Sequence, residues 1–111
     1  MEEPRDRRVR VKTPVSFEGQ SGVGRGTVFN ISLTGCALES LAGVKMDSTI
    51  RLDLHIPTDK KPVKVGRARV IWTAGEDMGV EFIKMDQTGK ARLQRFIENL
   101  MPKKTPKADK V

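Results

Sequence analysis

Apolar and polar residues alternate along most of this chain, which is the period-two pattern of β-strands with one buried face. The longest uninterrupted case is residues 50–56, where the apolar positions are Ile50, Leu52, Leu54 and Ile56. A second case starts near the N-terminus and places these apolar side chains on one face: Val9, Val11, Val15 and Phe17. The pattern predicts antiparallel strands that each bury one face.

Turn residues separate the expected strands. Residues 18–26 contain four glycines in nine positions, and this density predicts a turn. Residues 27–31 and 36–40 are then expected to form short strands on either side of a Ser-Leu-Thr-Gly turn. The next turn is expected at 57–61.

The alternation reverses within residues 63–72. The first apolar residues, Val63 and Val65, are at odd-numbered positions. The later ones are at even-numbered positions and would face the other side of a regular strand: Ala68, Val70 and Trp72. One inserted residue reverses every following side chain, so we predict a β-bulge near Gly66. A turn at 74–77 then leads into a last strand at 78–83.

The C-terminal part has a different period. After Asp86, a candidate N-cap, apolar residues recur at helical spacing, and these are Leu93, Phe96, Ile97, Leu100 and Met101. Pro102 is the stop signal. We expect the helix to lay this stripe over an open end or edge of the sheet. The fold class is therefore mainly β, a small antiparallel barrel or sandwich of six or seven strands with a C-terminal α-helix, and we assign it as a barrel.

The length of 111 residues suits one domain. We expect a flexible basic arm at 1–8, the β-barrel domain at 9–101 and a disordered basic tail at 102–111. The net charge of +7 divides into +2 for residues 1–12, +2 for 13–100 and +3 for 102–111. This distribution favours local capture of an anion over a broad nucleic-acid-binding face. With one cysteine, no secretion signal and no apolar stretch of membrane-spanning length, we expect a cytoplasmic protein without membrane insertion.

Candidate catalytic groups are sparse, so we expect a binding module that is not an enzyme and needs no cofactor. His55 is on the polar face of its strand, and Cys36 has no adjacent base and is expected to be buried. The sequence has no metal-ligand spacing of Cys and His, so no metal site is expected. The glycines of residues 22–26 precede a strand, which gives no helix N-terminus for a phosphate.

Two polar segments remain as candidate binding elements. The first is the arm, with Arg5, Arg7, Arg8 and Arg10. The second is the turn Asn-Ile-Ser-Leu-Thr-Gly, with Asn30, Ser32 and Gly35. Each alone is also what a solvated arm or an ordinary hairpin turn would contain. Their combination over residues 5–100, together with the later segment GRARVIWTAGEDMGVEF and the final helix, resembles the PilZ domain, a bacterial receptor for cyclic di-GMP.

The resemblance implies a site for the arm and the turn. The family has an Arg-x-x-x-Arg arm and an Asp/Asn-x-Ser-x-x-Gly turn, and the turn matches here at Asn30, Ser32 and Gly35. Arg8 takes the second arginine position, whereas Pro4 stands at the first. Arg5 or Arg7 must then supply the missing guanidinium.

The residue types fit such a ligand chemically. Arginine bonds phosphate or the guanine O6/N7 edge bidentately and stacks on rings. We expect Asn30 to accept from guanine N–H groups, Ser32 to donate to the ligand, and Gly35 to leave space for its approach. Arg10 is a further candidate contact. Trp72 is either a core residue or a stacking partner of a base.

Three functions follow as alternatives. In the first, cyclic di-GMP orders the arginine arm, and the new surface signals to a downstream protein, which by family resemblance belongs to motility, biofilm or exopolysaccharide machinery. In the second, a PilZ-like interaction adaptor binds no nucleotide. The third, a nonspecific nucleic-acid binder, is disfavoured because the chain has no Tyr and only five aromatic residues for base stacking.

Overall fold

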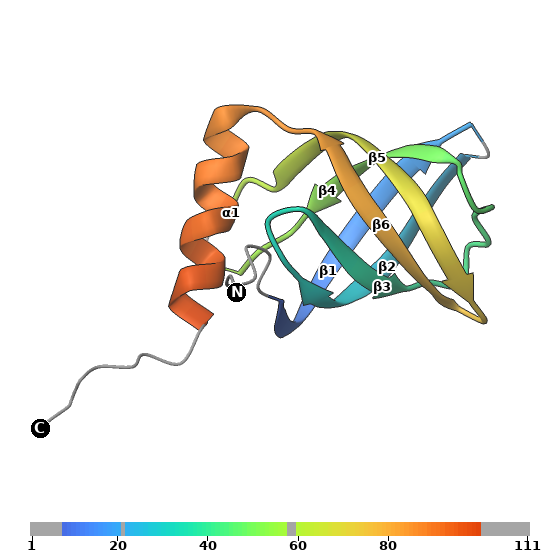
Figure 1. Ribbon diagram of the computed structural model, residues 1–111, viewed down its shortest axis with the longest axis horizontal. Coiled ribbons are helices and arrows are strands. Elements are labelled where there is room, and N and C mark those ends of the chain that lie inside the picture. The colour runs from blue at the N-terminus through green and yellow to red at the C-terminus, as the bar shows by residue number, and fades with distance from the viewer. Residues whose placement is uncertain (1–7, 21, 58–59, 101–111) are drawn as a thin grey trace, which may run out of the picture.

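The computed structural model describes residues 8–20, 22–57 and 60–100, and these form a six-stranded barrel followed by one helix (Figure 1). The strands and the helix are β1 (Val9–Gly19), β2 (Gly22–Ile31), β3 (Gly35–Glu39), β4 (Thr49–Leu54), β5 (Val63–Ala74), β6 (Asp77–Lys84) and α1 (Gln87–Leu100). All neighbouring strands are antiparallel. The predicted fold class is confirmed.

The barrel closes because β1 pairs with strands on both of its sides. The order around the barrel is β1-β2-β3-β6-β5-β4, and Val15 is the Cα partner of Gly26 in β2 and of Leu54 in β4. A closed barrel leaves no unpaired sheet edge, so every strand has its register fixed from two neighbours.

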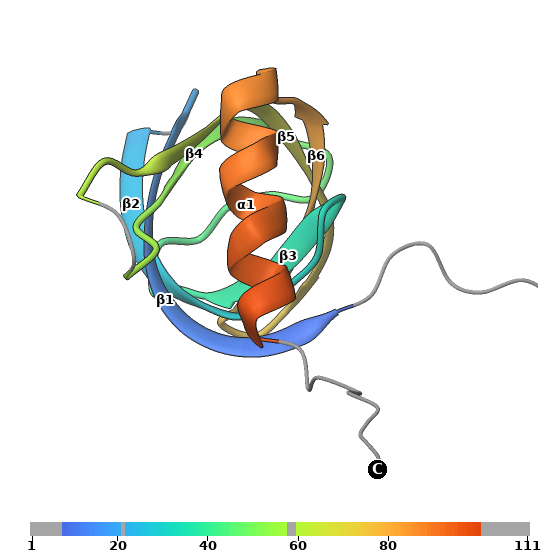
Figure 2. The same ribbon diagram turned by 90° about the vertical axis from the view of Figure 1, so that its left-hand side faces the viewer.

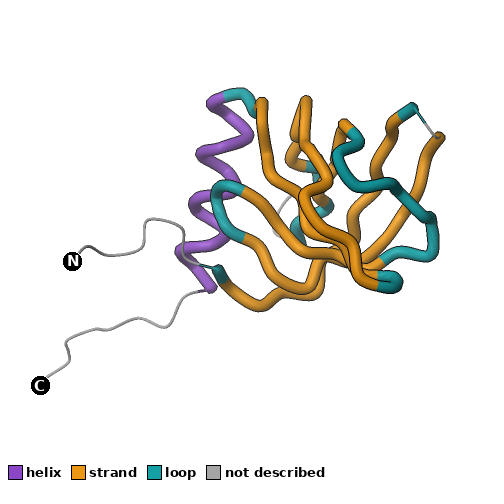
Figure 3. Tube along the Cα trace, turned by 45° about the vertical axis from the view of Figure 1, so that its right-hand side comes forward, coloured by secondary structure: helices purple, strands orange, loops and turns teal. Residues whose placement is uncertain are grey.

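The helix covers one end of the barrel (Figure 2). Asp86 caps it as predicted, since its Oδ1 accepts the backbone N–H of Gly89 at 2.8 Å. Leu93, Phe96 and Ile97 are buried in the core, whereas Leu100 is 45% exposed and Met101 lies outside the described residues. The β1–β2 and β3–β4 connections are at the end of the barrel away from the helix (Figure 3). No helix in the described ranges has the length and apolar character to cross a membrane.

The glycine-rich segment is mostly strand, so its interpretation as a turn was wrong over most of its length. Strand β1 continues to Gly19, and β2 begins at Gly22. A Cβ at Gly24 would lie 2.6 Å from the ring of Phe17, and one at Gly26 would overlap the carbonyl oxygen of Glu39. These two glycines therefore provide space for a core ring and for the neighbouring strand.

A β-bulge in β5 reverses which of its positions face the core, as predicted. Ile50 pairs with Ala68 whereas Leu52 pairs with Val65, so two residues of β5, Gly66 and Arg67, face one of β4. A second register shift lies between Val70 and Trp72. It turns Trp72 to the outside, where it is 40% exposed, so Trp72 does not share the buried face of Val70.

Cys36 points into the core, as expected for a small apolar residue, and is 1% exposed. Burial raises the pKa of its thiol from 9.0 to about 12, and the positive charge of Arg8 opposes this rise only in part. The folded state thus favours the neutral thiol.

The buried thiol gives a pH-dependent expectation. Because its pKa is about 12 in the folded chain, Cys36 should not react with Ellman's reagent at pH 9 until urea unfolds the protein. In the unfolded chain the thiol ionises near pH 9.0. Burial of the neutral thiol therefore contributes fully to the free energy of unfolding below that pH, and this contribution disappears as the pH rises toward 12. The difference in free energy of unfolding between wild type and Cys36→Ala should therefore shrink over this range. Rapid labelling of the folded protein would contradict the expectation.

Gly35 should resist substitution for a steric reason. A Cβ at Gly35 would overlap the carbonyl oxygen of Val80 in β6, whereas a Cβ at Gly43 meets no atom within 4 Å. We expect Gly35→Ala to lower the free energy of unfolding by about 1–3 kcal/mol, the usual cost of overpacking. Gly43→Ala, the matched control, should change it by less than about 0.5 kcal/mol. Urea unfolding midpoints test both, and equal midpoints would refute the steric account.

Candidate functional site

A hydrogen bond between Arg8 and Asn30 links the start of β1 to the end of β2. Arg8 precedes β1 directly, and Asn30 is the Cα partner of Arg10. The Nη1 of Arg8 donates a hydrogen bond of 2.7 Å to Oδ1 of Asn30, 22 residues away in sequence. Arg8 is exposed and Asn30 is half-buried. Arg8 and Asn30, chosen from the sequence as candidate site residues, are thus in direct contact.

The contact fixes the position of Arg8 without neutralising its charge. Asn30 is a neutral amide, and no carboxylate forms an ion pair with Arg8 or Arg10 in the part of the chain that the structure describes. A guanidinium has five N–H donors, and only one bond to Asn30 is formed here. The remaining donors and the full positive charge of Arg8 are available at the protein surface.

Ser32 is buried and holds the turn that follows Asn30. Its Oγ accepts the backbone N–H groups of Thr34 at 3.1 Å and Gly35 at 3.2 Å. Its own O–H lies 3.3 Å from the carbonyl oxygen of Gly35. We expected this hydroxyl to donate to a ligand. In this conformation its exposure is 0%, and its bonds are within the turn.

Gly35 has a similar structural explanation. The space that its missing side chain leaves is filled by the backbone of β6 at Val80. Close approach of a ligand, the reason expected from the sequence, is therefore not needed to explain this glycine.

Arg10 and Trp72 are at opposite ends of one row on the outer face of the barrel. Following the register across the sheet, Arg10 pairs with Asn30, Asn30 with Ala37, Ala37 with Gly79, and Gly79 with Trp72. A Cβ on Gly79 would overlap Nε1 of Trp72, so the indole lies over this glycine. Two strand spacings, about 10 Å, separate the Cα atoms of Asn30 and Gly79.

Gly79 was missed by the sequence reasoning, although a signal for it was present. Met78 and Val80 are inward-facing apolar residues on either side, so the alternation places position 79 outward. A glycine directly across from a tryptophan in an antiparallel pair provides space for the ring. The core alternative for Trp72 is thereby excluded. The ring is on the same outer face as Asn30.

Arg5 and Arg7 lie outside the described residues. Residues 1–8 as an arm and 102–111 as a tail remain predictions, because only Arg8 of these segments is described.

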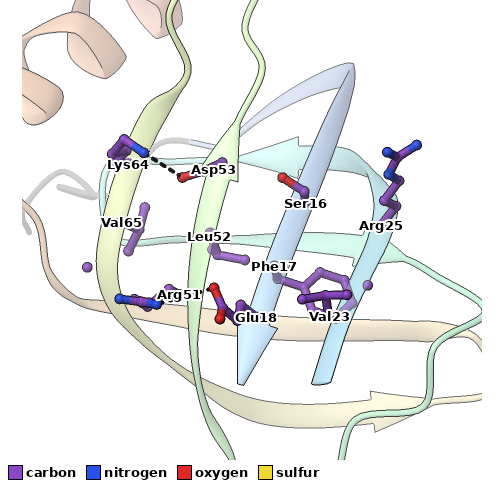
Figure 4. A pocket seen from close by; sticks show the side chains of 12 residues that line it. Ser16, Phe17, Glu18, Val23, Arg25, Arg51, Leu52, Asp53, Lys64 and Val65 are labelled. Carbon is purple, nitrogen blue, oxygen red and sulfur yellow. Dashed lines mark hydrogen bonds and ion pairs between the residues drawn. The ribbon is translucent and has the colours of Figure 1, made fainter. Parts of the chain in front are cut away.

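The outer face also carries a hollow of about 710 Å³ over β1, β2, β4 and β5 (Figure 4). Two of its cations are paired with acids, Arg51 with Glu18 at 3.2 Å and Lys64 with Asp53 at 3.6 Å. These ion pairs leave little net positive charge for an anion. We therefore place the candidate site at Arg8 and Asn30, at the opposite ends of β1 and β2.

Metal and nucleophile chemistry receive no support from the described side chains. No group of three His, Cys, Asp or Glu residues within the described ranges could hold a metal ion. His55 has Nε2 at 3.2 Å from Oγ of Ser16 on an exposed surface. Arg8 and Asn30 offer a positive charge and hydrogen-bonding groups, which are suited to an anion or a polar ring edge.

Comparison with known proteins gives the same fold. The chain is similar to the PilZ domain with c-di-GMP of YcgR from Escherichia coli, with a TM-score of 0.70 and 15% identity over 99% of this chain and 100% of that one. It is similar to the PilZ domain of CeSA from a cellulose-synthesizing bacterium, with a TM-score of 0.65 and 14% identity over 85% and 97% of the two chains.

A third similar structure is the Bacillus subtilis inhibitor of motility MotI/DgrA, with a TM-score of 0.71 and 17% identity over 89% of this chain. The match covers 52% of the Bacillus chain, so the present chain spans about half of that protein's length. A comparison with curated protein sequences gave no match. The model of the PilZ domain family matches residues 2–99, which is nearly the whole chain. The chain belongs to the PilZ domain family.

Proposed function

We propose that this chain is a cyclic di-GMP receptor module that signals through a partner protein. Family membership supports the class of function, and the similar YcgR domain was solved with c-di-GMP. The observation that carries the proposal is the hydrogen bond from Arg8 to Asn30. It holds one arginine of the arm beside the turn motif while leaving its charge unpaired.

Arg8 has the donors that such a ligand needs. A cyclic guanine dinucleotide presents two phosphates and two guanine Hoogsteen edges, and a guanidinium can bond either kind of group bidentately. Because Asn30 takes one bond from Nη1, the rest of the fork is free to turn toward the ligand. Arg10, exposed and next to Asn30 in the register, adds a second positive charge.

Trp72 is the proposed aromatic surface of the site. Its indole lies over Gly79, and between Gly79 and Asn30 in the row is only the small side chain of Ala37. A purine held by Arg8 would therefore lie within reach of the indole. Stacking or edge contact between aromatic rings typically contributes about 0.5–1.5 kcal/mol.

Arg5 and Arg7 are proposed to close over the ligand from the arm. They precede Arg8 by three residues and one residue in the sequence, and Arg8 is hydrogen-bonded to Asn30. Ordering of this arm on binding would create a surface that a partner recognises. The partner belongs, by family resemblance, to motility, biofilm or exopolysaccharide machinery.

The second candidate function is a PilZ-type interaction adaptor that binds no nucleotide. The observation in its favour is Pro4, which stands where the family's first arginine is expected. Calorimetry of the wild type with cyclic di-GMP separates the two functions, because the adaptor should give no binding heat.

Arg8→Ala should weaken cyclic di-GMP binding without unfolding the barrel. The variant removes the charged donor at the surface, and loss of a charged hydrogen bond commonly costs about 1.5–3 kcal/mol, or roughly tenfold to a hundredfold in Kd. The matched control is Arg25→Ala, which removes an exposed arginine from the other end of β2. Calorimetry should show the loss for Arg8→Ala only. Equal Kd values for both variants and the wild type would refute this site.

Trp72 provides an internal probe of binding, because the chain has one Trp and no Tyr. At 40% exposure the indole is accessible to a ligand, so saturating cyclic di-GMP should change its emission. The titration midpoint should agree with the calorimetric Kd and should move to higher concentration in Arg8→Ala. Binding heat without any change in emission would remove Trp72 from the site.

A further inference from the structure

Strands β5 and β6 present three large apolar side chains to the outside of the barrel. These are Ile71, Trp72 and Ile83, with exposed fractions of 39%, 40% and 49%. The residues Val70 and Val80, which are Cα partners in the same pair of strands, are buried in the core. The exposed apolar side chains therefore lie on the outer face of a well-packed part of the sheet.

The two isoleucines are at irregular positions of the β5–β6 ladder, which contains two register shifts. At one shift Ile83 of β6 has no Cα partner in β5, and at the other Ile71 of β5 has none in β6. An extra residue of this kind bends its strand, and such bulges are over-represented next to functional sites. Both irregularities of this ladder thus coincide with an exposed isoleucine.

The charged side chains on this face are mainly basic. Arg67 and Lys84 are Cα partners, and like charges directly opposite each other destabilise a sheet. Arg69 is the Cα partner of Glu81. Within the described ranges, none of these four residues forms an ion pair. Three bases and one acid give this group a net charge of +2, which an acidic partner would complement.

A partner of this face must bind through side chains. The barrel is closed, so β5 pairs with β4 and β6, and β6 pairs with β3 and β5. Neither strand presents a free edge to which an extended peptide could add as a further strand. An amphipathic helix can instead place apolar side chains on the isoleucines and charged side chains on the surrounding bases.

An anionic membrane suits the same face less well. Interfacial anchors bury a continuous apolar face at the headgroup boundary. In the register of β5 and β6, Arg69 and Glu81 lie between Ile71 and Ile83. Insertion of both isoleucines would carry a guanidinium and a carboxylate with them, and burial of charges is costly unless each is paired. A protein helix can supply these pairing groups.

We propose that the outer face of β5 and β6 is the docking surface for an acidic amphipathic helix of a partner protein, an inference that rests on the partner signalling of the proposed function and specifies its partner. The surface is defined by Arg67, Arg69, Ile71, Ile83 and Lys84. The isoleucines supply the apolar contacts, whereas the bases attract acidic side chains and disfavour a basic helix. Trp72 borders this surface, so a ligand bound at the proposed cyclic di-GMP site would lie beside the docked helix.

The test is an NMR titration of the isotope-labelled full chain with three synthetic peptides of equal length. The first has glutamate on one face of a helix and leucine on the other. The second has the same composition in an order without helical period, and the third has lysine in place of glutamate. Only the first should shift the amide signals of residues 69–72 and 81–84, and added salt should weaken its binding. Vesicles of phosphatidylglycerol and phosphatidylcholine are the fourth probe.

Matched variants locate the docking surface. Ile83→Ser should raise the Kd of the acidic peptide about fivefold or more, as loss of a central apolar contact does. Val23→Ser is its control, because Val23 is also apolar and exposed but belongs to β2. Arg69→Gln should also raise the Kd, and high salt should remove its difference from the wild type. Arg25→Gln is the control for charge. Urea unfolding midpoints establish that each variant is folded.

Several results would overturn the docking surface. These are no binding of the acidic peptide, equal binding of the peptide without helical period, amide shifts confined to other strands, or equal Kd values for Ile83→Ser and the wild type. Binding of the vesicles through β5 and β6 in place of the acidic peptide would overturn it in favour of a membrane.

Calorimetry with cyclic di-GMP separates this inference from the receptor function. If the wild type and Ile83→Ser bind cyclic di-GMP with the same Kd but the acidic peptide does not dock, the docking surface is wrong and the receptor function stands. If the acidic peptide docks on β5 and β6 but the wild type binds no cyclic di-GMP, the receptor function is wrong and the docking surface stands.

Discussion

Closure of the barrel is the constraint on which the rest of this structure depends. Because β1 pairs with both β2 and β4, no strand can slip by one residue without moving its own inward-facing side chains to the outer face. Closure needs close backbone approach, which the glycines at 26 and 35 permit where a Cβ would overlap a carbonyl oxygen. The same fixed register aligns residues from five strands in one row on the outer face, from Arg10 to Trp72. The candidate site is therefore a consequence of how the sheet closes.

The residues of the turn motif and Arg8 differ in burial and in their role in the fold. Ser32 and Gly35 are buried and satisfy the packing and hydrogen bonds of the turn, so they support the shape of the site. Arg8 is exposed and bonded to a neutral amide, which orients the guanidinium but leaves its charge without a counterion. An Asp at position 30 would hold the arginine more strongly and would also cancel its charge. With Asn30 the positive charge of Arg8 remains at the protein surface.

Much of the fold follows from the sequence, since period-two alternation located β4 and β6 and the Asp86 cap located the start of α1. The errors have physical causes. Glycines in residues 22–26 were interpreted as a turn because local chemistry does not reveal that Phe17 needs the space at Gly24 or that the backbone of Glu39 needs the space at Gly26. Trp72 was grouped with Val70 because a second register shift depends on pairing with β6. Arg8 and Asn30 were identifiable as residue types, but their hydrogen bond depends on a register that only the closed barrel sets.

That hydrogen bond also changes how the turn motif is to be understood. From residue types alone, Asn30, Ser32 and Gly35 all appear suited to contact a ligand. In the folded chain the hydroxyl of Ser32 and the space at Gly35 are used within the protein, and Oδ1 of Asn30 accepts one hydrogen bond from Arg8. Ser32 and Gly35 therefore fix the shape of the turn, and the hydrogen-bonded pair of Arg8 and Asn30 lies beside it, with the positive charge of Arg8 at the protein surface.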